Sequence, residues 1–155
     1  MAHSTMAMAD KHRLMLATYN LHGLNQGKPY LVSLCNEYDF IFVQEHWLAA
    51  FDLNCLDTVS NNMVCYASYA LDDAISTSCL KGRPFGGLAF FVNNRFATSS
   101  RLVSAANLYI ILQYEDMLFI HVYLPCKSSA HCGEEFADCL ASIMHNISEL
   151  QYIRW

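Results

Sequence analysis

Hydrophobic residues gather in short runs separated by polar turns, and most of these runs have the length of a β-strand. Residues 14–19 and 40–43 form two such runs, both rich in residues that favour strands. Between them, after a Gly-Lys-Pro break at residues 27–29, apolar residues at helical spacing around Leu34 indicate a short helix. The chain is therefore expected to open with a β-loop-α-β unit.

Further strand-like runs follow along the chain, at residues 63–70, 88–92, 101–104, 108–114 and 117–124. Polar residues 71–84 between the first and second of these runs predict a loop. Glu115 and Asp116 predict a tight hairpin between the last two runs. Because short connections join strands that pair side by side, the last four runs are expected to be antiparallel neighbours.

After Pro125 the spacing of apolar residues changes from that of a strand to that of a helix. Steps of four and three residues predict an amphipathic helix whose apolar side packs on a sheet, formed by Phe136, Leu140, Ile143, Ile147 and Leu150. Residues 152–155 are typical of the start of another strand. Strands and helices together predict an α/β (α+β) fold.

Length and composition favour one folded domain. The chain has 155 residues, of which 54% are hydrophobic and 15% charged, and this excludes a disordered protein. We expect residues 1–12 to form a disordered tail and residues 13–155 to form the domain. No apolar run approaches the roughly 18 residues of a membrane span, and the start lacks the pattern of a signal peptide. The expected location is intracellular, in the nucleus or cytoplasm.

Net charge and cysteine spacing limit the kinds of binding site that the chain is expected to contain. The net charge of −5 argues against a basic surface for nucleic acid over the whole molecule. It leaves room for a locally basic cleft, or for a metal that supplies positive charge. The seven cysteines include no C-x-x-C pair, so their spacing indicates neither a zinc site nor a disulfide framework. Small buried thiols are the simpler interpretation.

Three polar residues each stand at the end of an apolar strand: Asn20, Glu45 and Tyr123. Glu45 has no basic neighbour in its own segment, so unless it is a solvated loop residue it needs a partner or a cation. A carboxylate, an amide and a phenol that meet at one cleft would suit a magnesium-assisted phosphate site, because Mg²⁺ prefers oxygen ligands and keeps several waters.

The order of motifs around these residues resembles the endonuclease/exonuclease/phosphatase superfamily. Within that superfamily the chain is most similar to the apurinic-type endonuclease domains of non-long-terminal-repeat retrotransposons. The resemblance runs from about Leu14 to the end of the chain. It rests on four short motifs in the correct order: Asn20-Leu21-His22-Gly23-Leu24, Gln44-Glu45-His46-Trp47-Leu48, residues 86–92 (GGLAFFV) and Val122-Tyr123-Leu124-Pro125.

This resemblance implies a four-layer αββα sandwich with a mixed, mostly antiparallel sheet. It implies that Asn20 lines the catalytic site, that Glu45 binds a divalent metal, and that Tyr123 contacts the scissile phosphate. The implied cofactor is Mg²⁺, the implied partner is DNA, and the implied reaction is hydrolysis of a phosphodiester by water.

The chain also departs from the family pattern. The later G-D-x-N and S-D-H motifs, which orient the attacking water and polarise the phosphate, do not occur in it. The resemblance therefore implies an N-terminal part with the C-terminal half missing, most of the second sheet absent and one sheet face uncovered. Such a chain is expected to be inactive. His22 stands where some family members carry a second metal-side aspartate, which leaves any auxiliary role for it open.

Two other functions stay open at this point. One is a catalytically dead remnant that binds nucleic acid or a partner, and the other is a phosphatase acting on a small phosphoester. For nucleic-acid contact the candidates are Lys81 and Arg83, on a loop rich in Gly and Pro, and His46 beside the metal-binding candidate. A solvated loop and a packed histidine are the structural alternatives. His121 is expected to be a satisfied core or rim histidine.

Overall fold

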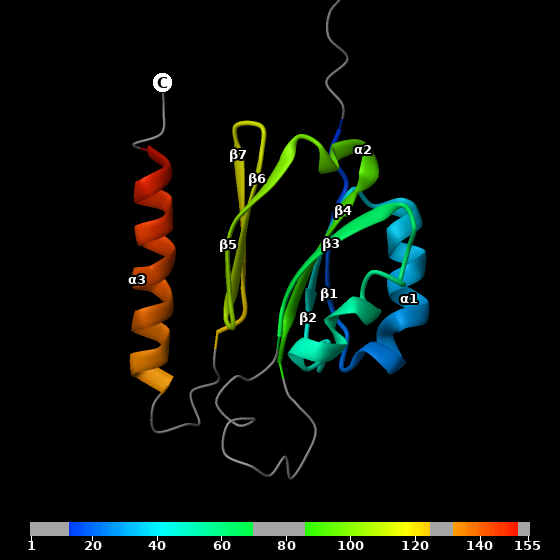
Figure 1. Cartoon of the computed structure of the whole chain (residues 1–155), viewed down its shortest axis with the longest axis horizontal. Coiled ribbons are helices and arrows are strands. Elements are labelled where there is room, and N and C mark those ends of the chain that lie inside the picture. Colours follow the sequence, from blue (N-terminus) through cyan, green and yellow to red (C-terminus); the bar gives the residue numbers. More distant parts are fainter. Residues whose placement is uncertain (1–12, 70–85, 125–131, 152–155) are drawn as a thin grey trace, which may run out of the picture.

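Four layers stack across the molecule in the order helix, sheet, sheet, helix (Figure 1). The structure is a computed structural model that describes residues 13–69, 86–124 and 132–151. Its elements, in chain order, are β1 (Leu16–Asn20), α1 (Leu24–Glu37), β2 (Phe40–Gln44), the 3₁₀ helix η1 (Ala50–Cys55), β3 (Met63–Ser68), β4 (Leu88–Asn93), α2 (Asn94–Ala97), β5 (Ser100–Ala106), β6 (Tyr109–Tyr114), β7 (Met117–Val122) and α3 (Cys132–Gln151). The predicted αββα class is confirmed.

The first sheet has the strand order β1-β2-β4-β3. β1 and β2 are parallel, as the β-loop-α-β prediction requires, and the other two pairings are antiparallel. β2 and β4 lie in the middle of this sheet, with α1 against one face and the second sheet against the other. Burial on both faces explains why these two strands read as continuous apolar runs.

Helix α1 is longer than the sequence predicts, because it continues through residues 27–29. Gly27 lies inside the helix, where a Cβ atom would lie 2.1 Å from Leu21 Cδ2 and 2.8 Å from the Leu21 backbone oxygen. The glycine therefore allows close packing of α1 on the loop after β1. The Gly-Lys-Pro segment is a packing feature here and does not start the helix.

The second sheet has the order β5-β6-β7 and is antiparallel throughout. Tyr114 pairs with Met117 across the predicted hairpin, so that turn is confirmed. The prediction that β4 and β5 are neighbours is wrong, because they belong to different sheets. Between them α2 begins, where Arg95 forms an ion pair with the buried carboxylate of Asp39. The other oxygen of that carboxylate accepts the Met15 N–H at 2.9 Å.

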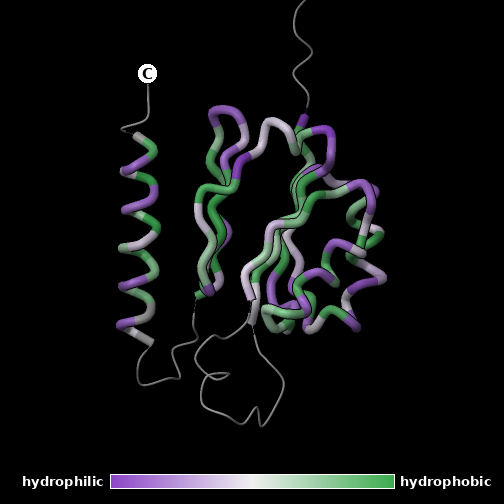
Figure 2. Tube along the Cα trace, in the orientation of Figure 1, coloured by the Kyte–Doolittle hydropathy of each residue, from purple (hydrophilic) through white to green (hydrophobic). Residues whose placement is uncertain are grey.

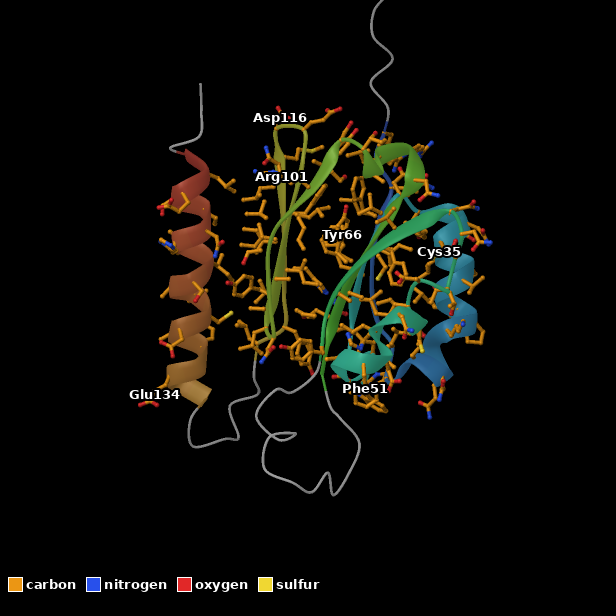
Figure 3. All side chains as sticks on the ribbon, in the orientation of Figure 1. Cys35, Phe51, Tyr66, Arg101, Asp116 and Glu134 are labelled. Atoms are coloured by element: carbon orange, nitrogen blue, oxygen red, sulfur yellow. The ribbon has the colours of Figure 1, made fainter. Side chains whose placement is uncertain are left out.

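The two sheets pack face to face through an aromatic core. Figure 2 shows hydrophobic residues along the strands of both sheets. Phe40 lies at its centre, with ring centroids 6.2 Å from Phe90 and 5.0 Å from Phe119 of the second sheet. Tyr66 packs against the same core and lies between the sheets in Figure 3. The expectation of an uncovered sheet face is wrong, because residues 100–122 themselves form a second sheet over the first.

Helix α3 covers the other face of the second sheet. Cys139 and Ile143 are buried there against Tyr109 and Ile111. Three further apolar residues of this helix are exposed by 41%, 42% and 64%: Phe136, Leu140 and Met144. The predicted helix is confirmed, and Ile143 and Ile147 of the predicted apolar stripe pack on the sheet. The prediction that Phe136 and Leu140 pack there too is wrong, because both are exposed. Within residues 13–69, 86–124 and 132–151, no helix is long and apolar enough to cross a membrane.

The cysteines that the structure describes and places are free thiols. Cys35 and Cys139 are buried, Cys65 is half-buried and Cys55 is exposed. Burial raises the pKa of the Cys35 thiol to about 11, so it stays protonated and unreactive near neutral pH. Packing explains the buried thiols without a metal or a disulfide.

Candidate functional site

Asn20 and Glu45 meet because they follow two parallel strands that lie side by side. Asn20 ends β1 and pairs in register with Gln44, the last residue of β2, so Glu45 lies one residue beyond the same edge of the sheet. Leaving this edge requires a sharp turn of the chain, and Glu45 adopts a left-handed backbone conformation with φ 57°. Such a conformation is uncommon for a residue with a side chain and is found more often at functional sites.

Tyr123 reaches this edge from the second sheet. It lies just after β7, where its N–H donates to the Leu108 oxygen at 2.9 Å. The Tyr123 hydroxyl donates a hydrogen bond of 2.5 Å to Glu45 Oε1. The site is therefore built across the sandwich, from residues 78 positions apart in the sequence. Asn20, Glu45 and Tyr123 converge at one edge, as their positions after three strands predict.

The surroundings of Glu45 favour its charged form. The hydrogen bond from Tyr123 is the main cause that lowers the pKa of this carboxyl, and a side-chain hydrogen bond from Asn20 and the nearby imidazole of His22 add to it. Partial burial acts in the opposite direction but is outweighed. The Glu45 side chain is 18% exposed. An ionised carboxylate is thus held in fixed orientation at the rim of the sandwich.

The backbone around Glu45 is tied to two other loops. The Glu45 N–H donates to the Gly87 oxygen at 2.9 Å, and the Glu45 oxygen accepts the Gly23 N–H at 2.8 Å. His22 and Trp47 also have positive φ angles, of 49° and 58°. Strained residues cluster here and are fixed by these hydrogen bonds, which is the pattern expected of a preorganised site.

His46 is a buried structural residue, and the expectation that it contacts nucleic acid is wrong. Its side chain has no exposed surface. Its Nδ1 accepts the Leu48 N–H at 3.0 Å, so its Nε2 carries the proton and donates to the Ser68 oxygen at 2.9 Å. Burial lowers the pKa of the ring, which keeps it neutral. A Cβ atom at Gly87 would lie 2.4 Å from this ring, which explains a glycine there.

His121 behaves as predicted and is buried in the core. Its Nε2 lies 2.9 Å from the Val43 oxygen, which joins β7 to β2 across the two sheets. This contact lies on the same side of the sandwich as the bond from Tyr123 to Glu45. Lys81 and Arg83, the other two candidates for nucleic-acid contact, lie outside the described residues.

His22 has a place in the site that the sequence did not assign. It follows β1 by two residues, is 69% exposed, and its Nδ1 lies 3.3 Å from Glu45 Oε2. A cleft of about 290 Å³ opens beside it, between the start of α1 and the loop after β2. Lining residues come from both segments: His22, Gly23, Leu24, Asn25, Gln26, His46, Trp47 and Leu48. Glu45, Asn20 and Tyr123 are not among the residues that line this cleft.

The residues present fit a weakly chelated divalent cation. Mg²⁺ is commonly bound through one or two carboxylates while it keeps several waters, and a single oriented carboxylate matches that need. No cluster of three or more His, Cys, Asp or Glu side chains suited to a metal occurs in the described part of the chain. The described residues therefore place one oriented carboxylate, Glu45, at this edge, without a group of side chains that forms a metal site.

Comparison with solved structures finds the same fold in a 3′ phosphatase and in an AP endonuclease. The chain superposes on the 3′ phosphatase NExo from Neisseria, bound to a product DNA hairpin, with a TM-score of 0.62 and 14% identity over 92% of this chain and 54% of that chain. It superposes on the AP endonuclease LMAP from Leishmania major with a TM-score of 0.53 and 11% identity over 72% of this chain and 40% of that chain.

The chain thus spans about half the length of these neighbours. At such low identity the likeness establishes the fold alone. Neither the protein-family models nor the curated proteins gave a match.

Proposed function

We propose that this chain carries one half of a divalent-metal-dependent phosphodiesterase site of the DNA endonuclease type, derived from a retroelement reading frame. The observation that supports this most strongly is the ionised Glu45, held by Tyr123 and Asn20 at the edge where both sheets end. A partly buried carboxylate that stays charged needs hydrogen-bond partners or a cation, and Mg²⁺ is commonly held by one or two carboxylates.

The role of each residue in this proposal follows from its chemistry. Glu45 is the metal ligand, through the oxygen that does not accept the Tyr123 hydroxyl. Asn20 fixes the carboxylate, and its own Oδ1 accepts the His22 N–H at 3.1 Å, which shapes the loop. Tyr123 positions Glu45 and donates to a phosphate oxygen when substrate arrives. Mg²⁺, when bound, stabilises negative charge on the phosphate and on the leaving oxygen.

On this proposal the chain by itself binds but does not cleave. The motifs that orient water and polarise the phosphate in the family are absent from its sequence, and losing members of a cooperating set lowers the rate by orders of magnitude. Lys81 and Arg83 are the proposed contacts with a nucleic-acid backbone. A remnant that binds nucleic acid without any metal chemistry is the competing function.

A nicking assay tests the first part of this proposal. Purified chain is incubated with supercoiled plasmid and Mg²⁺, and with Mn²⁺ in parallel. We expect no nicking above that of the Glu45→Gln variant purified in the same way. Metal-dependent nicking by the chain that Glu45→Gln abolishes would contradict the claim of inactivity, while supporting Glu45 as a metal ligand.

A chimera separates a half-site from a remnant. The chain is fused to the C-terminal half of a nuclease of this fold that supplies G-D-x-N and S-D-H motifs, and folding is checked by circular dichroism. We expect Mg²⁺-dependent cleavage that Glu45→Ala abolishes and Tyr123→Phe weakens less, because the tyrosine contributes one hydrogen bond. DNA binding should survive both changes. A chimera that folds and binds DNA but never cleaves it favours the remnant.

A further inference from the structure

We propose that the free edge of β7 docks an uncharged, apolar strand of a partner polypeptide, which extends the second sheet beyond β7. The inference goes beyond the proposed function, because it concerns an interaction surface and needs no metal. It starts from exposed apolar residues of three elements that border one position beside β7: Leu16 of β1, Ile120 of β7, and Leu140 and Met144 of α3.

The backbone of β7 has an unused edge. β7 is the last strand in the order β5-β6-β7, so within the described residues only β6 pairs with it. Tyr123, just after β7, turns its N–H toward β6, where it donates to the Leu108 oxygen. Because successive residues of a strand alternate in the direction of their backbone groups, those of Leu118, Ile120 and Val122 point to the free edge. These groups can form a ladder with one more strand.

The two edges of the second sheet differ in their protection against such pairing. β5 carries Arg101, and its register with β6 shifts between Leu102 and Ser104. A charge and a bulge both hinder the addition of a strand at an edge. β7, from Met117 to Val122, contains no Asp, Glu, Lys, Arg, Gly or Pro and pairs with β6 without a register shift. β7 is therefore the edge suited to pairing.

A strand added to β7 would have β1 beneath it. His121 Nε2 lies 2.9 Å from the Val43 oxygen, which places β7 over β2, while β5 lies against β3. β1 is the next strand of the first sheet beyond β2. Leu16 and Thr18 lie on the sheet face that carries Phe40 into the core, because Leu16 pairs in register with Phe40. Both are exposed, Leu16 by 47%, so the second sheet ends one strand short of the first on this side.

Helix α3 would cover the other face of the added strand. Figure 1 shows this helix running along the outer face of the second sheet, which Ile143 contacts. On one side of Ile143, Asp138 and Ser142 line a cleft together with the last residue of β5. Leu140 and Met144 lie on the opposite side of the helix, which is therefore the side of β7, and they are exposed by 42% and 64%.

The shape of this side of the sandwich fits one strand of a partner better than a second copy of the chain. β1 extends about 4.8 Å, one strand spacing, beyond β7, so two copies that brought their β7 edges together would collide at β1. A single extended segment fits between β1 and α3, and both of its faces meet apolar side chains. The fold also accommodates more polypeptide than this chain supplies, since the chain matches 54% and 40% of its two structural neighbours.

Pairing at β7 would also bring the partner to the candidate site. Tyr123 follows directly after β7 and donates its hydroxyl to Glu45. Whichever way the added strand runs, one of its ends therefore lies beside these two residues. The partner is thereby placed to add further groups next to the Glu45 carboxylate.

Fluorescence anisotropy of the whole chain with a labelled peptide tests the proposal. The probe is a synthetic copy of β4, residues 88–93, with two lysines added for solubility, because this segment is an uncharged strand that is buried on both faces. We expect the peptide to bind. The same peptide with an N-methylated backbone keeps its side chains but cannot donate to a ladder, and it should not bind.

Variants of the chain locate the binding edge. Ile120→Lys should weaken peptide binding by about tenfold or more, because it places an unpaired charge in an apolar contact. Leu102→Lys, on the β5 edge with an exposure of 40% against 37% for Ile120, is the matched control and should bind as the wild type does. Met144→Lys on α3 should also weaken binding, which keeps the test decisive if Ile120→Lys fails to fold by circular dichroism.

Amide hydrogen exchange gives a readout for each residue. We expect the peptide to slow exchange at Leu118, Ile120 and Val122 and to leave β3 and β5 unchanged. No binding to the wild type, equal weakening by Ile120→Lys and Leu102→Lys, or protection confined to another edge would overturn the proposal. So would a wild-type dimer in sedimentation that Ile120→Lys converts to a monomer, because a second copy would then occupy this edge.

Discussion

At the scale of single residues, the site depends on Glu45 being held in one orientation by groups from three segments. Tyr123 comes from the second sheet, Asn20 from β1 and His22 from the loop after β1. None of these three residues is close to Glu45 in the sequence. The group of four side chains therefore forms only when the chain folds. Its energetics can therefore be read from stability measurements as well as from activity.

Tyr123→Phe is expected to destabilise the fold in a pH-dependent way. The pKa of Glu45 is lowered in the folded state, chiefly by the Tyr123 hydroxyl. The bond therefore contributes fully above the unfolded pKa of about 4.3, and its contribution is lost as the pH falls through the folded value. We expect a loss of about 1–2 kcal/mol at pH 7 and a smaller loss near pH 3. Urea unfolding at both pH values measures it; an equal loss at both would contradict this account.

Gly87→Ala tests the packing beneath the site. Gly87 has φ 83°, and a Cβ atom there would lie 2.4–2.8 Å from three atoms of the His46 ring. Backbone strain and the displaced ring should together lower the free energy of unfolding by about 2 kcal/mol or more. Gly133→Ala is the matched control, because a Cβ atom there meets nothing within 4 Å. A chemical denaturation curve for Gly87→Ala that overlays the control would refute the role given to Gly87.

The site could be predicted only in part, and particular residues show why. Asn20, Glu45 and Tyr123 stand after apolar strands, and strand ends are visible in the sequence. The burial of His46 is not visible, because it depends on Ser68 and Leu48 closing around both ring nitrogens. The approach of His22 to Glu45 depends on positive φ angles, and at most the Gly23 beside His22 hinted at an unusual turn.

At the scale of elements, helix α3 carries two apolar stripes, one buried against the second sheet and the other exposed. Ile143 is 6% exposed against the second sheet, whereas Leu140, on the neighbouring stripe, is 42% exposed. We expect Ile143→Ala to lower the free energy of unfolding by about 2–4 kcal/mol and Leu140→Ala by about 1 kcal/mol or less. Equal losses in thermal or urea unfolding would mean that α3 does not pack on the sheet through the Cys139 and Ile143 stripe.

Element prediction succeeded where periodicity is strong and failed where pairing is decided at long range. The hairpin at Glu115 and Asp116 and the amphipathic α3 were predictable from local pattern. The length of α1 was not, because Gly27 looks like a break until Leu21 is seen to occupy the space of its missing side chain. Local pattern also could not predict that the chain leaves the first sheet after β4 and enters the second sheet at β5. Only tertiary packing decides to which sheet a strand belongs.

At the scale of the whole molecule, the αββα stack explains how a chain spanning 54% and 40% of its structural neighbours still folds around a core. Both faces of the first sheet are covered, one by α1 and one by the second sheet. The expectation of an uncovered sheet face is wrong because residues 100–122 form the second sheet and not a part of the first. The packing of the second sheet on the first also brings Tyr123 over the edge of the first sheet. The order of the layers therefore determines the geometry of the site.

The central claim is that Glu45 holds a divalent cation, and Mg²⁺ binding to the whole chain tests it most directly. Calorimetric titration is run on the wild type, on Glu45→Gln and on Glu149→Gln, which removes an exposed carboxylate of α3 as the matched control. The account predicts that Glu45→Gln weakens Mg²⁺ binding about tenfold or more, while Glu149→Gln binds as the wild type does. Wild-type affinity in Glu45→Gln, with its fold intact by circular dichroism, would contradict the claim.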